Sequence, residues 1–160
     1  MNARTELVKA LAATVAEIAA TAHQLQQVLQ AEHAALIAAD EHGLLAATAQ
    51  KTQCLQRLDA LEVERAHLLA LCVDGGRSQP FAMTRALAER PDALLAWEQA
   101  VQTLEDCRSR NQVNGSTVEA RLRHVRRALE LLTGASTESD LYGRHGTSEK
   151  LRRSQTLARI

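Results

Sequence analysis

Aromatic and β-branched residues are scarce in this chain of 160 residues. Phe, Tyr and Trp occur once each, and Val and Ile together number 12, whereas there are 29 Ala and 24 Leu residues. Ala and Leu have high helix propensities, while strands depend on β-branched and aromatic residues. The composition therefore argues against a β-sheet protein and predicts an all-α fold. It also argues against most enzymes with a ligand pocket, because aromatic and bulky apolar groups usually line such pockets.

The chain has no net charge, since 19 basic and 19 acidic side chains balance. Such a chain has no overall field that would attract nucleic acid or anionic lipid. The charges are unevenly spread, however, because residues 119–160 hold nine basic and five acidic side chains. The C-terminal end is therefore the basic end.

Long apolar runs are missing, since none approaches the roughly 18–20 residues of a membrane span. Glu6 and Lys9 interrupt the N-terminal apolar pattern, so we expect no signal peptide. The three cysteines, Cys54, Cys72 and Cys107, form neither a CxxC motif nor a zinc spacing. These features predict a cytoplasmic protein with reduced thiols and no membrane insertion.

Heptad repeats are the strongest pattern in the sequence. They predict helices over about 4–39, 44–72 and 92–133, with a loop and a short helix over 73–91. Gly43 suits the position just past the end of the first helix. The stripe of the first helix is Val8, Leu11, Val15, Ile18, Ala22, Leu25, Leu29, Glu32, Leu36 and Ala39. The stripe of the second is Leu44, Ala47, Lys51, Cys54, Leu58, Leu61, Arg65, Leu68 and Cys72.

The third helix contains Asn114-Gly115, a dipeptide that by itself predicts a break. The register continues without a slip on both sides, which favours one helix. Its stripe is Leu94, Trp97, Val101, Leu104, Arg108, Asn111, Gly115, Val118, Leu122, Val125, Leu129 and Leu132. Residues 135–160 have few apolar anchors and are expected to be a flexible basic tail.

The first two stripes can be aligned as an antiparallel hairpin in which Leu25 faces Leu58. In this register the acidic residue of the first seam, Glu32, meets the lysine of the second, Lys51, and the pair would mark the register. The alternative is that both side chains extend to solvent without touching. The prediction is an elongated antiparallel three-helix bundle or coiled coil over 1–134.

No catalytic, cofactor or metal site is apparent. The six histidines form no HxxxH or HExxH motif, and the glycines near Asp74 lack a phosphate-loop frame. Cys54 and Cys72 fall on a core seam, where burial is the usual role. The arginines of residues 121–127 are typical of a solvated helix face. They also leave a nucleic-acid contact open, although aromatic stacking partners are absent and no nucleic acid is expected. We predict that the protein is not an enzyme.

Four local patterns occur in a fixed order along the chain. The second helix has the form Lys-x-x-x-Leu-x-x-Leu-x-x-Leu-x-x-x-Arg and follows a glutamate of the first. An isolated Trp lies early in the third helix. An Asn-x-x-Asn-Gly element and a Leu-Tyr-Gly-x-x-Gly element follow. Their residues are Glu32, Lys51, Leu55, Leu58, Leu61, Arg65, Trp97, Asn111, Asn114, Gly115, Leu141, Tyr142, Gly143 and Gly146.

With these patterns the chain resembles the FlgN-type flagellar type III export chaperones over nearly its whole length. It departs from many relatives in having Ser116-Thr117 after the Asn-Gly pair. The resemblance implies a protein without catalytic activity that binds hook–filament junction proteins through their terminal helices. It also implies delivery to the cytoplasmic domain of the flagellar export gate.

The resemblance assigns roles to particular residues. The C-terminal part of the third helix would bind cargo, and the residues assigned to this role are Val118, Leu122, Val125, Leu129 and Leu132. Tyr142 would dock on the export gate. Glu32, Lys51, Asn111, Asn114 and Gly115 would be structural. Physical reasoning allows this division, because an apolar helix stripe can accept an amphipathic partner helix. The same stripe could instead pack on the first two helices.

Two other functions stay open at this point. The heptads would also suit a structural coiled-coil protein that self-associates, so a homo-oligomer is compatible with the sequence. The basic C-terminal region would suit a nucleic-acid-binding adaptor.

Overall fold

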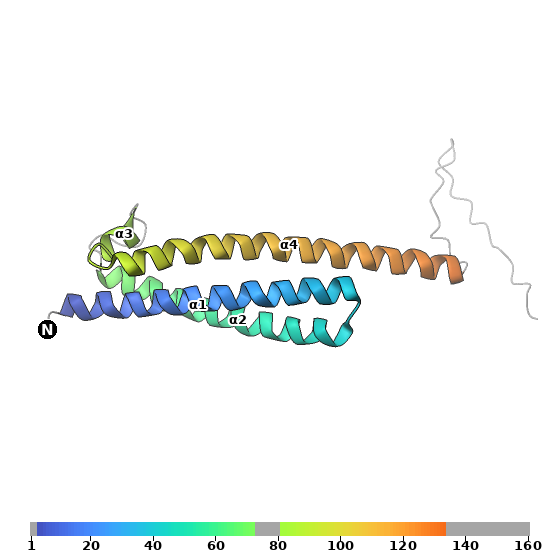
Figure 1. Ribbon diagram of the computed structural model, residues 1–160, viewed down its shortest axis with the longest axis horizontal. Coiled ribbons are helices and arrows are strands. Elements are labelled where there is room, and N and C mark those ends of the chain that lie inside the picture. Colours follow the sequence, from blue (N-terminus) through green and yellow to red (C-terminus); the bar gives the residue numbers. More distant parts are fainter. Residues whose placement is uncertain (1–2, 73–80, 134–160) are drawn as a thin grey trace, which may run out of the picture. The chain divides into compact units, whose positions relative to one another are not determined.

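Four helices follow one another in a computed structural model that describes residues 3–72 and 81–133 (Figure 1). They are α1 (Ala3–Ala38), α2 (Glu41–Cys72), α3 (Ala82–Ala86) and α4 (Pro91–Thr133). These described residues contain no strand, and the predicted all-α bundle is confirmed. α4 continues as one helix through Asn114 and Gly115. No helix in the described part of the chain is sufficiently long and apolar to cross a bilayer.

The chain divides into two compact units, Met1–Ala120 and Arg121–Ile160. The first unit holds α1, α2, α3 and most of α4. In the second unit the structure describes only the helical residues 121–133. The tail that the sequence predicts to be flexible, 135–160, lies outside the described residues.

The turn between α1 and α2 corrects one detail of the sequence interpretation. Gly43 was expected just past the first helix, but it lies in the first turn of α2. Ala39 takes the left-handed position instead, with φ 56°. The carboxylate of Asp40 accepts a hydrogen bond from the Gly43 backbone N at 3.0 Å, which caps the start of α2. A Cβ at Gly43 would collide with that carboxylate, so the glycine leaves room for the cap.

The seam between α1 and α2 follows the predicted heptads closely. Within α1, the stripe residues from Leu11 to Leu36 are all buried. Within α2, Ala47, Cys54 and Leu61 are buried at intervals of seven residues. The two helices run antiparallel, and their backbones approach each other along much of their length.

The seam of α4 differs from the predicted stripe at every second position. Sequence analysis placed Leu94, Val101, Arg108 and Gly115 in the seam. The buried residues of α4 are Ala93, Ala100, Thr103, Cys107 and Asn114, and all of these except Thr103 directly precede one of the four predicted positions. The predicted residues Leu94, Trp97 and Leu104 are partly buried and pack against the core. At positions 93 and 100 small side chains fill the seam because they fit between packed helices, whereas the sequence interpretation favoured the larger neighbours Leu94 and Val101.

The core of the first unit consists of three clusters arranged along the helices. The first joins Leu11 and Val15 of α1 to Leu69 of α2 and Leu87, next to α3. A second cluster forms around Ile18, Leu61 and Ala100. The third joins α1, α2 and α4, and it contains Leu25, Val28, Leu29, Ala47, Cys54 and Cys107.

Candidate functional site

The described helical segment of the second unit carries apolar side chains that face solvent. Leu122, Val125 and Leu129 are 51–53% exposed and Leu132 is 84% exposed. Their spacing of three and four residues places them on one face of the helix. Exposed apolar side chains are normal when they are scattered, but a contiguous patch is typical of an interaction surface. These four residues, the apolar face, are the candidate site.

Val118 was predicted to belong to the same stripe, and it lies in the first unit. It is 38% exposed, less than any member of the apolar face. Asn114 is the last buried residue of α4, and none of the residues 115–133 is buried. Val118 is exposed enough to be contacted, and its role in binding remains a prediction from the sequence.

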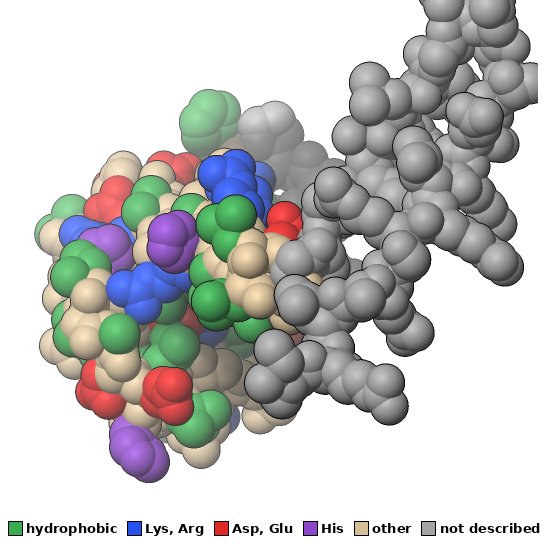
Figure 2. Space-filling model, turned by 90° about the vertical axis from the view of Figure 1, so that its right-hand side faces the viewer, with side chains coloured by type: hydrophobic (Ala, Val, Ile, Leu, Met, Phe, Trp, Pro, Cys, Tyr) green, Lys and Arg blue, Asp and Glu red, His purple; other side chains and the backbone are tan. Residues whose placement is uncertain are grey.

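The charged residues among 121–133 are mostly basic. Arg121, Arg123, Arg126 and Arg127 stand against one acidic residue, Glu130. Helical periodicity places Arg123 and Arg127 on the side of the helix away from the apolar face. The segment is therefore an amphipathic helix with a basic side. On the face of the molecule that Figure 2 shows, apolar and charged side chains are instead intermingled.

A polar layer inside the first unit accounts for four of the five residues predicted to be structural. The predicted contact between Glu32 and Lys51 is present as an ion pair between α1 and α2. Asn111 of α4 accepts a hydrogen bond from Lys51 Nζ at 3.4 Å. Asn114 Nδ2 donates to the second carboxylate oxygen of Glu32 at 2.9 Å. The layer thus connects α1, α2 and α4.

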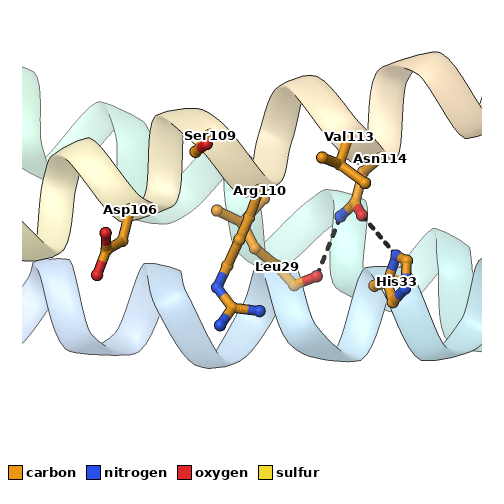
Figure 3. A pocket seen from close by; sticks show the side chains of 7 residues that line it. All are labelled: Leu29, His33, Asp106, Ser109, Arg110, Val113 and Asn114. Atoms are coloured by element: carbon orange, nitrogen blue, oxygen red, sulfur yellow. Dashed lines mark hydrogen bonds between the residues drawn. The ribbon is translucent and has the colours of Figure 1, made fainter.

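Asn114 makes two further contacts with α1 (Figure 3). Its Nδ2 donates to the backbone oxygen of Leu29 at 3.0 Å, and its Oδ1 accepts from Nδ1 of His33 at 3.0 Å. Glu32 is only 5% exposed, so the alternative in which its side chain extends to solvent is excluded. A buried carboxylate is costly unless it is paired and hydrogen-bonded, and this one has both kinds of partner.

Gly115 contributes nothing to this layer. A Cβ added there would have no neighbour within 4 Å. The position therefore has no steric need for glycine, and its predicted structural role rests on the sequence motif alone.

A pocket of about 410 Å³ borders the polar layer on the side of α1 and α4 (Figure 3). Its charged groups are Asp106 and Arg110, with His33 at one end. The described residues contain no group of three His, Cys, Asp or Glu side chains that could hold a metal ion. The pocket offers hydrogen-bonding groups but no nucleophile paired with a base.

The cysteines serve as packing residues in the described structure. Cys54 and Cys107 are buried in the same cluster, and Cys107 Sγ lies 3.7 Å from the backbone oxygen of Ala22. Burial raises the pKa of all three cysteine thiols, including Cys72. A raised pKa keeps a thiol protonated at neutral pH, which makes it a poor nucleophile.

Three features of the polar layer and of the α4 seam were not found by sequence reasoning. They are the seam position of Asn114, the hydrogen bond from His33 and the alanine positions of α4. The recurrence of small residues at positions 93, 100 and 107 was the available signal for this seam. Tyr142, predicted to dock on the export gate, lies outside the described residues.

Comparison with known proteins identifies one family. The family model described as FlgN protein matches residues 1–150. No curated protein and no solved structure matches the chain. The match confirms the resemblance that the local sequence patterns indicated.

Proposed function

The chain belongs to the FlgN family, and we propose that it is a cytoplasmic chaperone that escorts hook–filament junction proteins to the flagellar export gate. Membership of this family indicates a flagellar export chaperone. Our proposal goes beyond family membership in naming hook–filament junction proteins as the cargo and in assigning docking on the export gate. In this role the protein acts by binding and has no catalytic activity.

The observation that supports cargo binding is the exposure of the apolar face on residues 122–132. An amphipathic cargo helix would lay its own apolar side along Leu122, Val125, Leu129 and Leu132. Each leucine that becomes fully buried would contribute about 1.5–3 kcal/mol to the hydrophobic term. Val118 would extend the contact, with a smaller gain because it is less exposed.

Docking on the export gate is assigned to Tyr142. A tyrosine can anchor a peptide-like contact, since aromatic residues are enriched at binding hot spots. We predict that Tyr142→Ala leaves cargo affinity within about twofold and weakens binding to the cytoplasmic gate domain by tenfold or more, as expected for a hot spot. Surface plasmon resonance with the two ligands in parallel measures both effects. Unchanged affinity for the gate would contradict the assignment.

Calorimetric titration with the C-terminal helical segment of a junction protein tests the function as a whole. We expect micromolar or tighter binding with a negative heat-capacity change, the mark of apolar burial. No binding at high concentration, together with sedimentation as a dimer or larger species, would favour a self-associating coiled-coil protein. Steeply salt-dependent binding to duplex DNA would favour the adaptor function.

A further inference from the structure

A second apolar surface lies on the first unit, in a groove between α2 and α4. The groove has a volume of about 200 Å³. Its base is formed by core residues of α1 and α4, and its sides by residues of α2 and α4. The residues that line it are Leu25, Leu29, Lys51, Leu55, Leu58, Leu104, Cys107, Arg108 and Asn111.

The packing of the helices explains why this groove is open. The backbones of α1 and α2 approach closely, whereas α4 packs on them mainly through its side chains. Leu25, Leu29 and Cys107 are buried at the base. Leu55 is 47% exposed, although it lies beside these buried side chains. The groove thus presents an apolar base with an apolar side chain on its edge, a hollow that apolar side chains of an added helix could fill.

The charges in the groove restrict what it can bind. Lys51 and Arg108 are its only charged lining residues, and both are basic. Lys51 is engaged by Glu32 of the polar layer. Arg108 has no ion pair in the part of the chain that the structure describes. A partner that fills the apolar base would therefore gain from a carboxylate placed opposite Arg108.

We propose that the groove between α2 and α4 binds an amphipathic helix of the cargo subunit, with an acidic side chain of that helix facing Arg108. This inference rests on the proposed chaperone function and adds a second contact to the apolar face. The groove is bounded by helices, its base is apolar and its edge carries Arg108, whose charge no acidic residue of the described chain pairs. These three properties match a helix with leucine-like anchors spaced by three and four residues and an acidic flank.

The test uses the full chain, a purified junction protein as the probe and isothermal calorimetry as the readout. Leu55→Asp places a charge in the groove, and we expect it to weaken binding about tenfold or more, the loss of one buried leucine. Leu45→Asp is the matched control, because Leu45 is 69% exposed on the same helix and does not line the groove. The control is expected to stay within about twofold of wild type.

Arg108→Glu tests the charge separately from the apolar base. We expect binding to weaken about three- to tenfold and to depend less on salt, as for the loss of a charge-assisted contact. Circular dichroism should show unchanged helicity for all three variants, since Leu45, Leu55 and Arg108 are exposed. Equal affinities of Leu55→Asp and Leu45→Asp, or an Arg108→Glu variant that binds like wild type, would overturn the proposal.

The outcomes separate the groove from the chaperone function. If cargo binds wild type and Leu55→Asp alike, the function stands and the groove proposal fails. Failure of wild type to bind any junction protein would refute the function, and the groove proposal with it. Conversion of a dimer to a monomer by Leu55→Asp in sedimentation would show that a second copy of this chain fills the groove, which would also overturn the proposal.

Discussion

The stripe of α1 and the apolar face of residues 121–133 follow the same heptad rule but have opposite surroundings. In α1 the stripe residues from Leu11 to Leu36 are buried. In the second unit, Leu122, Val125 and Leu129 remain about half exposed. Periodicity therefore determines which face of a helix is apolar, but not whether that face is covered by the same chain or offered to another protein.

The two regions also differ in that the first unit has small residues in its seams beside its buried leucines. The seams of the first unit include Ala22, Ala47, Ala93 and Ala100, which allow helices to pack closely. The apolar face of the second unit consists of leucines and one valine. Small side chains therefore occur among the buried seam residues of the first unit and are missing from the apolar face.

The two regions should differ most in the free energy of unfolding that is lost when a leucine is truncated to alanine. Leu29 is buried in the core of α1, so Leu29→Ala should lower the free energy of unfolding by about 2–5 kcal/mol. Leu132→Ala in the second unit should change it by less than about 0.5 kcal/mol. Urea unfolding followed by circular dichroism measures both. An equally large loss of unfolding free energy in Leu132→Ala would show that Leu132 belongs to the core, and the two regions would then not differ in this way.

Within the first unit, two ion pairs join α1 and α2, and we expect a smaller difference in unfolding free energy when one or the other is removed. The Lys51–Glu32 pair includes a buried carboxylate, whereas the Arg57–Glu17 pair is exposed on both sides. Lys51→Ala leaves that carboxylate with less compensation and should cost about 1–3 kcal/mol. Arg57→Ala should cost about 0–1 kcal/mol. Equal costs in urea unfolding would refute the interpretation of the polar layer as a structural device.

The smallest effect concerns the glycine that follows the last buried residue of α4. Gly115→Ala should raise the free energy of unfolding by about 0.5–1 kcal/mol, because alanine is the better helix former and its Cβ meets no neighbour. Gly43→Ala should lower it, since the new Cβ collides with the Asp40 carboxylate. Thermal unfolding measures the two shifts. A destabilised Gly115→Ala variant would show that the position needs glycine for a reason other than space.

The hairpin of α1 and α2 could be predicted from the sequence because its seam is long and uninterrupted. The antiparallel alignment of the two stripes places Glu32 opposite Lys51, and their contact is present in the structure. The family could be identified from local elements such as Asn-x-x-Asn-Gly. These are features of short range or of strict periodicity, which a single sequence displays directly.

The seam of α4 could not be predicted because two overlapping stripes fit its sequence. Val101 is more hydrophobic than Ala100, so hydropathy favours an exposed position over the buried one. The choice depends on how closely α4 can approach α1 and α2, which is a property of the packed bundle. The burial of Asn114 depends likewise on partners from α1 that lie more than 80 positions away in the chain.

The central claim is that the apolar face binds cargo and is not needed for folding, and Leu129→Asp tests it most directly. Leu131→Asp is the matched control, because Leu131 is 84% exposed on a different face of the same helix. Cargo affinity by calorimetry and helicity by circular dichroism should be measured on the same samples. The account predicts that Leu129→Asp weakens cargo binding about tenfold or more, while helicity is retained and Leu131→Asp binds like wild type. Lost helicity, or equal binding by the two variants, would contradict it.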